Sequence, residues 1–254
     1  MARRKHSKRR RRGGFLYKLI SILVICGAIL LALTLFFRVN TIEVAGQRRY
    51  SEEEIREASG IQEGDNLYLL NKHEVAGRIV QALPYIESIR INRKLPDGIH
   101  IEIKECGKPM AVLQDEGAWL VSPQGKIVAR ITEAEAAEYG VISGCQLLAP
   151  SVGTPIALAT EYHTQQTSLV SLLSALEDAG LADDVKNVRL DDLAYLEMDY
   201  TDRFTVRLAY DADYAWELQR LVLSLEKDVI QSNMTGIFDL QSNAEEVYFI
   251  PELR

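Results

Sequence analysis

Hydrophobic and polar positions follow three different patterns along these 254 residues. From Leu19 to Phe37 there are nineteen residues without a charge, and almost all of them are apolar. At 1.5 Å per residue, a helix of this length extends about 28 Å, close to the roughly 30 Å hydrocarbon core of a bilayer. We therefore predict a single transmembrane helix over residues 19–37.

Basic residues crowd the tail before this apolar run, whereas no acidic residue occurs before Glu43. Positive charge beside one end of a span keeps that end in the cytoplasm and favours anionic lipid headgroups. We expect residues 1–18 to form a basic cytoplasmic tail, and the residues that orient the span to be Arg9, Arg10, Arg11, Arg12 and Lys18.

Two other interpretations of this segment compete with a membrane anchor. A cleaved signal peptide has a shorter apolar core, usually about 7–15 residues, and ends at a small-x-small site that is not present after Phe37. A nucleic-acid patch would also be basic, but the adjacent apolar run favours membrane orientation.

The second pattern covers residues 38–105 and mixes the periods of strands and helices. Ile42 and Val44 share one face of a short strand, and Ser51 to Glu54 form a capping box at the start of a helix. A second helix over residues 71–83 is followed by two strands joined at Leu95–Gly98, where we expect Gly98 to adopt a positive φ. The order β-α-α-β-β predicts a small sheet with two helices on one face.

From about Cys106 the apolar runs become short and are separated by turn residues, which is typical of a strand-rich domain. We predict one helix over residues 168–179, a second helix capped by Asp213, and a loop around residues 143–155. The predicted strands cover residues 112–113, 119–121, 127–128, 186–191, 194–200, 203–209, 236–240 and 246–250.

Charge is divided unevenly along the chain. Residues 1–18 contain nine Lys and Arg and no acidic residue, which leaves 20 basic and 36 acidic residues after them, a net charge of −16. The value for the whole chain, −7, conceals this asymmetry. An acidic outer part argues against nucleic-acid binding there.

The residues needed for catalysis are not found in a recognisable arrangement. The four His residues are isolated, and no G-x-S-x-G, S-x-x-K, H-E-x-x-H or phosphate-binding loop occurs. We therefore expect no catalytic residue, no metal, no cofactor and no small-molecule substrate. Cys106 and Cys145 are not spaced as metal ligands, and whether they form a disulfide stays open.

A family resemblance rests on motifs across residues 42–105. The motifs are Ile42–Gly46, Ser51–Ile55, Gly60–Leu67, Leu83–Ile86, Arg93–Pro96 and Ile101–Glu105. Together they resemble the POTRA domain of FtsQ/DivIB cell-division proteins. Gly236–Leu240 is similar to a strand near the C-terminal end of proteins in that family. Gly125 stands where the family often has the glycine of an Asp-x-x-Gly motif. The chain departs from the family pattern at Cys106–Pro109 and at Ser122, where an Asp is usual.

The resemblance implies an α+β chain with a single N-terminal transmembrane helix. The expected domains are a cytoplasmic tail (1–18), the transmembrane helix (19–37), a β-α-α-β-β POTRA domain (38–106) and a mostly-β partner-binding domain with two or more helices (107–254). It further implies a non-enzymatic scaffold of septum formation at the outer face of the cytoplasmic membrane. The implied partners are membrane lipid and other single-pass division proteins, FtsB/DivIC-like and FtsL-like.

The final predicted strand, residues 246–250, is apolar and carries little protecting charge, so a partner strand could pair with it. The expected partner-binding residues are Ile237, Phe238, Asp239, Leu240, Val247, Tyr248, Phe249 and Ile250. Val247 and Phe249 could instead fill the core, and both roles are compatible because a strand has two faces and an edge.

Two rival functions remain at this point: a regulator or enzyme of cell-wall synthesis, and a POTRA-type secretion chaperone. The single apolar helix argues against the second, because secretion modules of this type normally precede an outer-membrane barrel.

Overall fold

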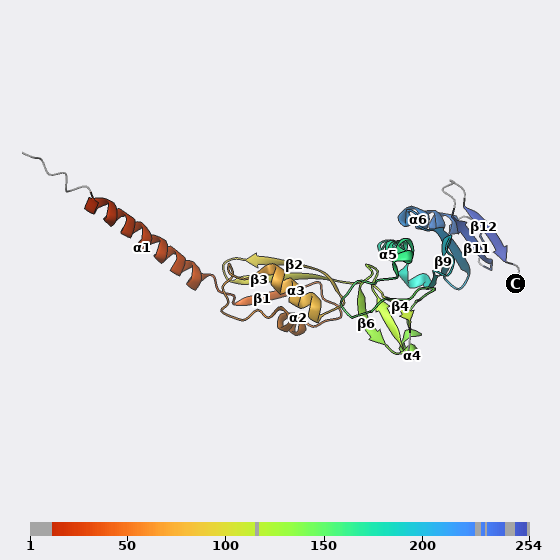
Figure 1. Cartoon of the computed structure of the whole chain (residues 1–254), viewed down its shortest axis with the longest axis horizontal. Helices are drawn as coiled ribbons and strands as arrows, with labels where there is room; N and C mark the ends of the chain where they lie inside the picture. The colour runs from red at the N-terminus through yellow and green to blue at the C-terminus, as the bar shows by residue number, and fades with distance from the viewer. Residues whose placement is uncertain (1–11, 115–116, 227–229, 232, 242–246, 253–254) are drawn as a thin grey trace, which may run out of the picture. The chain divides into compact units, whose positions relative to one another are not determined.

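The computed structural model describes residues 12–114, 117–226, 230–231, 233–241 and 247–252 (Figure 1). The chain folds into two compact units. One unit comprises the described residues through Arg78 together with Ile89–Ile103, and the other comprises Ile79–Ser88 with the described residues from Lys104 onward.

The N-terminal helix α1 spans Arg12–Phe36, and its described large apolar side chains are exposed. Within the described part of the chain, no helix meets the length and hydropathy required to cross a bilayer. Lys18 lies exposed on α1. Arg9, Arg10 and Arg11, and the side chain of Arg12, lie outside the described residues.

The β-α-α-β-β order predicted after the apolar run is confirmed. Its elements are β1 (Thr41–Ala45), α2 (Glu52–Ser59), α3 (Lys72–Ala82), β2 (Ile86–Lys94) and β3 (Gly98–Glu105). The three strands form a sheet in the order β1-β3-β2, in which β1 runs parallel to β3. Ile55 on α2 is buried, as are Ile99 and Ile101 on β3, which places the apolar faces predicted from the alternation inside this fold.

Local signals placed the start of α2 correctly. The Ser51 hydroxyl accepts a hydrogen bond from the Glu54 backbone N–H at 3.2 Å, and the Glu54 carboxylate accepts one from the Ser51 N–H at 2.7 Å. The predicted capping box is therefore present, and it satisfies two helix-end donors at once.

The turn between β2 and β3 corrects one expectation. Gly98 does not adopt a left-handed φ. It is restricted by space instead, since a Cβ there would press on the Thr41 hydroxyl and on the Lys94 carbonyl oxygen. The Asp97 carbonyl accepts hydrogen bonds from the N–H groups of Asn40 and Thr41, which fixes the turn against the start of β1.

The second unit is built on a nine-stranded sheet in the order β12-β11-β10-β9-β8-β7-β4-β5-β6. Its strands are β4 (Met110–Leu113), β5 (Ala118–Val121), β6 (Ile127–Ile131), β7 (Val141–Ser143), β8 (Val185–Arg189), β9 (Tyr195–Tyr200), β10 (Phe204–Ala209), β11 (Thr235–Leu240) and β12 (Tyr248–Glu252). Its helices are α4 (Glu133–Ala136), α5 (His163–Asp178) and α6 (Tyr214–Leu225), with 3-10 turns at Thr160–Tyr162 and Ala182–Asp184.

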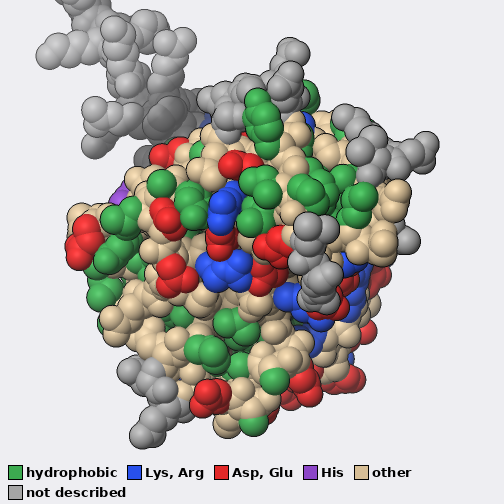
Figure 2. Space-filling view, turned by 90° about the vertical axis from the view of Figure 1, so that its right-hand side faces the viewer, with side chains coloured by type: hydrophobic (Ala, Val, Ile, Leu, Met, Phe, Trp, Pro, Cys, Tyr) green, Lys and Arg blue, Asp and Glu red, His purple; other side chains and the backbone are tan. Residues whose placement is uncertain are grey.

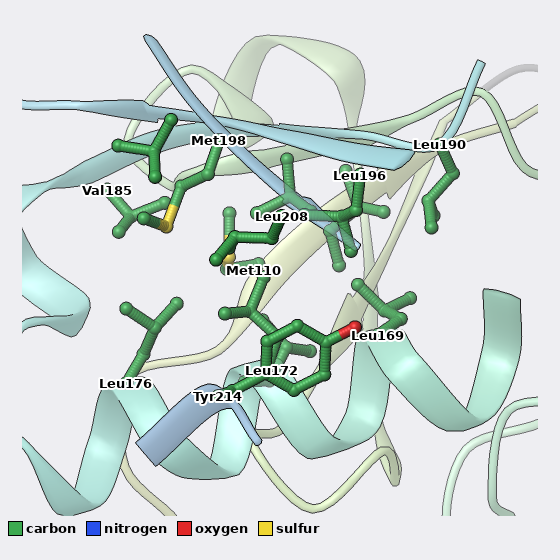
Figure 3. Packing of buried hydrophobic residues seen from close by; sticks show 14 of the residues in the cluster. Met110, Leu169, Leu172, Leu176, Val185, Leu190, Leu196, Met198, Leu208 and Tyr214 are labelled. Atoms are coloured by element: carbon green, nitrogen blue, oxygen red, sulfur yellow. The ribbon is translucent and has the colours of Figure 1, made fainter. Parts of the chain in front are cut away.

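One face of this sheet carries the main hydrophobic core. In Figure 3, Leu169, Leu172 and Leu176 of α5 point toward the side chains of the strands above them. Tyr214, at the start of α6, lies in the same layer. Asp213 caps α6 as predicted, because its side chain accepts a hydrogen bond from the Trp216 N–H at 3.2 Å.

Several boundaries differ from the predictions. The helix predicted from residue 168 begins five residues earlier, at His163, because the 3-10 turn before it leads directly into α5. The strand β7 and the short helix α4 were not predicted. Pro251 does not follow the last strand but lies within β12, which a strand at a sheet edge tolerates because a missing N–H costs least there.

Candidate partner-binding surface

The C-terminal end of the nine-stranded sheet is formed by β10, β11 and β12. The helix α6 connects β10 to β11, and the two strands run parallel, as a crossover connection requires. β12 then pairs antiparallel with β11, so that Ile250 lies opposite Ile237 and Tyr248 opposite Asp239. Among the described strands, β12 is the last in the sheet and pairs only with β11.

The expected partner-binding residues on β11 are divided between its two faces. Phe238 and Leu240 point into the core, where each is only 1% exposed. The rings of Phe204, Phe238 and Phe249 form a cluster with centroid separations of 4.9–6.1 Å. β10 and β12 flank β11 on both sides, so no free edge of β11 remains among the described strands.

Gly236 allows β12 to approach β11 closely. A Cβ at this position would collide with the carbonyl oxygen of Ile250 and press on the Phe249 ring. The small residue at the start of β11 therefore permits the pairing that creates the C-terminal edge of the sheet.

The accessible part of the expected site lies on β12. Tyr248 and Ile250 are 54% and 49% exposed, and their opposite residues Asp239 and Ile237 are half-buried on the same face of the sheet. Val247 and Phe249 are partly buried against the core. We call Tyr248–Glu252 the C-terminal edge. It combines an outermost strand with two large apolar side chains.

The same face of the neighbouring strands carries an ion-pair network that we call the charged ladder: Arg189, Glu197, Asp199 and Arg207. Arg189 donates two hydrogen bonds to the Asp199 carboxylate, at 2.6 and 2.8 Å. Glu197 accepts from Arg189 at 3.2 Å and from Arg207 at 2.9 Å. Side chains from β8, β9 and β10 are thus joined across three strands.

The charged ladder is satisfied within the protein. Burial raises the pKa of Asp199, but the hydrogen bonds that it accepts from Arg189, Asn187 and Thr205 outweigh burial and hold its pKa below the usual value. The ladder side chains are only 22–30% exposed. Because its charges already have partners, we interpret the ladder as a rigid support for the open face of the sheet rather than a ligand site.

Figure 2 shows one face of the molecule, on which Lys and Arg side chains lie beside Asp and Glu side chains with hydrophobic side chains around them. Such a mixed surface suits recognition of a protein segment better than binding of a polyanion.

The structure gives no positive sign of catalytic chemistry in the part that it describes. His, Cys, Asp and Glu side chains there form no group of three or more that could hold a metal ion. Cys106 and Cys145 do not form a disulfide, and burial raises the pKa of Cys145 to about 11, which makes it a poor nucleophile. Asp183 pairs with Lys108 at 3.0 Å, and Asp184 accepts a hydrogen bond from the Tyr200 hydroxyl.

A concave site that was not expected lies beside the start of α5. This pocket has a volume of about 490 Å³ and is open to solvent. The side-chain carbonyl oxygen of Gln165 is buried there and meets no donor among the described residues. No periodicity in the sequence marks this pocket, because its lining comes from loops, the 3-10 turn Thr160–Tyr162 and the first turn of α5.

The charged ladder was also missed from the sequence, although a signal was present. Glu197 and Asp199 alternate with apolar residues along one strand, and Thr205 and Arg207 do the same along the next. Opposite charges at alternate positions of adjacent strands predict cross-strand pairs once the pairing register is known.

Comparisons with known proteins agree with the fold. Residues 37–105 match the family model of the "POTRA domain, FtsQ-type". The cell division protein FtsQ of Syntrophotalea carbinolica is 30% identical over 190 residues, which cover 73% of this chain and 64% of that protein, slightly less than two thirds of its length.

Two further relatives extend this similarity. The cell division protein DivIB of Clostridium botulinum strain Loch Maree is 23% identical over 255 residues, covering 97% of this chain and 94% of the relative. The cell division protein FtsQ of Corynebacterium glutamicum is 27% identical over 161 residues, covering 61% of this chain and 72% of the relative.

Proposed function

This chain belongs to the FtsQ/DivIB family of cell-division proteins, and from that premise we propose that it is a non-enzymatic scaffold of septum formation. It links and recruits other single-pass division proteins, FtsB/DivIC-like and FtsL-like, at the outer face of the cytoplasmic membrane. The observation that carries this proposal is the C-terminal edge, an outermost strand with exposed apolar side chains.

The proposed membrane anchor consists of residues 19–37, with residues 1–18 in the cytoplasm. The nineteen uncharged residues and the nine basic residues before them support this topology. The POTRA domain (38–106) and the partner-binding domain (107–254) then lie outside. Because the anchor confines them to a plane, the effective concentration of other membrane-anchored partners rises, and a modest affinity per contact suffices.

Recognition at the C-terminal edge proceeds by addition of a partner strand to β12. Main-chain hydrogen bonds along the outermost strand supply affinity, and side chains at alternate positions supply selectivity. On the open face the incoming strand meets Tyr248 and Ile250, so we expect apolar side chains at its matching positions. Ile237 and Phe238 act indirectly, because they hold β11 against β12.

This proposal is tested by placing charge on the C-terminal edge. Lys at an exposed edge position opposes strand addition, so Tyr248→Lys with Ile250→Lys should weaken co-purification with the DivIC-like and FtsL-like partners at least tenfold, a loss of about 1.4 kcal/mol. The measurement is quantitative pull-down from membranes that express all three proteins.

The matched control is Leu193→Lys. Leu193 is 74% exposed and lies between β8 and β9, away from the C-terminal edge. This variant should retain full partner binding. Equal binding by the edge variant and the control, with both folded, would show that β12 is not the recognition strand.

A further inference from the structure

Four large apolar side chains are exposed in the N-terminal unit and form what we call the apolar rim: Phe36, Tyr68, Leu69 and Leu95. Leu69 is 80% exposed and Phe36 is 70% exposed. Three different segments supply these residues: the end of α1, the turn before α3, and the turn between β2 and β3. Water-exposed apolar side chains gathered from separate segments indicate a surface that is covered by another phase or molecule.

Both turns of the apolar rim are tied to the few residues that follow α1. The Leu67 N–H donates to the Phe37 carbonyl at 2.9 Å, and the Phe37 and Tyr68 rings meet edge to face with centroids 5.1 Å apart. The Asn40 N–H donates to the Asp97 carbonyl at 2.8 Å in the turn that contains Leu95. Both turns of the apolar rim are therefore hydrogen-bonded to residues that directly follow α1.

The turn that presents Tyr68 and Leu69 is held in place by hydrogen bonds. The Arg93 guanidinium donates to the carbonyl of Leu67 at 2.5 Å and to that of Leu70 at 3.1 Å. The Asn66 side chain accepts from the N–H groups of Tyr68 and Leu69 at 2.9 and 3.2 Å. Leu69 is thus fixed outward rather than exposed by chance.

Two cations lie beside the apolar rim in the chain. They are Arg38, which is exposed, and Lys72, which is half-buried, and neither forms an ion pair with a described carboxylate. Two of the acidic groups here accept hydrogen bonds within the unit. Asp65 accepts from the Gln62 N–H at 2.9 Å, and Asp97 accepts from the Asn40 side chain at 3.2 Å.

We propose that the apolar rim lies in the headgroup layer of the membrane, with Arg38 and Lys72 facing anionic lipid phosphates. This inference rests on the membrane anchor of the proposed function. It adds a second lipid contact, made by the folded POTRA domain itself. Aromatic side chains are favoured at this depth, and Lys and Arg beside a span are attracted to anionic lipid headgroups.

The short segment between α1 and the two turns supports the membrane as the phase that covers the apolar rim. Phe37 to Asn40 spans at most about 10 Å even when extended. The headgroup layer on each side of a bilayer is about 5–7 Å thick, as the difference between total and hydrocarbon thickness implies. Once α1 crosses the membrane, a turn bonded directly to Phe37 cannot lie far from that layer.

The test uses the full chain in vesicles of phosphatidylcholine with and without phosphatidylglycerol. A photoreactive benzophenone amino acid replaces Leu69 in one sample and Leu193 in a matched one, since both leucines are strongly exposed. Illumination should crosslink position 69, but not position 193, to phospholipid. The yield at position 69 should rise severalfold when phosphatidylglycerol is present.

Extraction with alkaline carbonate separates the hypothesis of a membrane anchor from the hypothesis that the apolar rim contacts lipid. A chain that resists extraction but forms no lipid crosslink at position 69 would overturn the inference while the anchor stands. A chain that is extracted would overturn both. In native membranes, a crosslink from position 69 to a protein instead of lipid would assign the apolar rim to a protein partner. Equal yields with and without phosphatidylglycerol would overturn the role of Arg38 and Lys72.

Discussion

Phe238 has a different position from the one expected for a contact residue. Its ring is buried between Phe204 and Phe249, with centroids 5.1 and 4.9 Å away. Its contribution to the C-terminal edge is therefore structural, because it fixes β11 and, through Phe249, the inner face of β12.

Phe238→Ala should destabilise the second unit by about 3–5 kcal/mol, since it removes a buried ring and leaves a cavity. Urea unfolding followed by tryptophan fluorescence measures this, because Trp119 and Trp216 both lie in that unit. Tyr248→Ala is the control. Because the Tyr248 side chain is exposed, this change should alter the free energy of unfolding by less than about 0.5 kcal/mol. Similar values for the two variants would contradict the assignment of Phe238 to the core.

Asp199 makes the stability of the charged ladder dependent on pH. Its pKa in the folded protein lies below the ordinary 3.8, so its contribution is complete above that value and is lost as the pH falls through the lower, folded pKa. The stability difference between the parent and Asp199→Asn should therefore be large at neutral pH and shrink below about pH 4. Urea midpoints measured across this range check it, and a difference that stays constant would refute it.

At the scale of elements, the capping box of α2 offers a local test. Ser51→Ala removes the acceptor for the Glu54 N–H and should destabilise the helix by about 1 kcal/mol. Amide hydrogen exchange should become faster in the first turn of α2. Ser51→Asp keeps an acceptor at the same position and should preserve most of the protection. Unchanged exchange in the Ala variant would show that the cap is not needed.

Elements with long periodic patterns were predictable from the sequence, whereas short ones were not. β10 alternates buried and half-buried residues as Phe204, Val206 and Leu208 indicated. α4 has only four residues and β7 only three, too few for either period to be recognised. Even so, Thr132 and Glu135 form a second capping box, a local signal that the sequence does contain.

The Gly98 turn illustrates a second limit of sequence interpretation. The Leu-Pro-Asp-Gly motif correctly marked the connection between β2 and β3. It did not identify why a glycine stands there, because the atoms that exclude a side chain belong to Thr41 and Lys94, and their approach depends on the folded sheet.

At the scale of the whole molecule, strand order was the least predictable feature. β7 pairs with both β4 and β8 in parallel, and β11 pairs in parallel with β10 across the helix α6. Such pairings join residues far apart in the chain, so composition and periodicity do not specify them. The apolar final strand was recognised in the sequence, but only the sheet order shows that β12, and not β11, is outermost among the described strands.

The proposed role also predicts where the protein gathers in a growing cell. A fluorescent fusion of the full chain should form a band at mid-cell, because the proposed role is in septum formation. The variant with Tyr248→Lys and Ile250→Lys should retain membrane labelling and lose its ability to bring the DivIC-like partner to that band. Uniform envelope labelling by the parent fusion would count against the division role.

The position of β12 after every other described strand has a consequence for timing. Domains form progressively during synthesis, as the chain emerges from its N-terminal side. While β12 is still missing, the edge of the growing sheet belongs to β11, and the side chains of Tyr248 and Ile250 are not yet beside it. The proposed partner surface therefore forms only after β12 has been synthesised and paired with β11, and a chain that still lacks β12 does not present it.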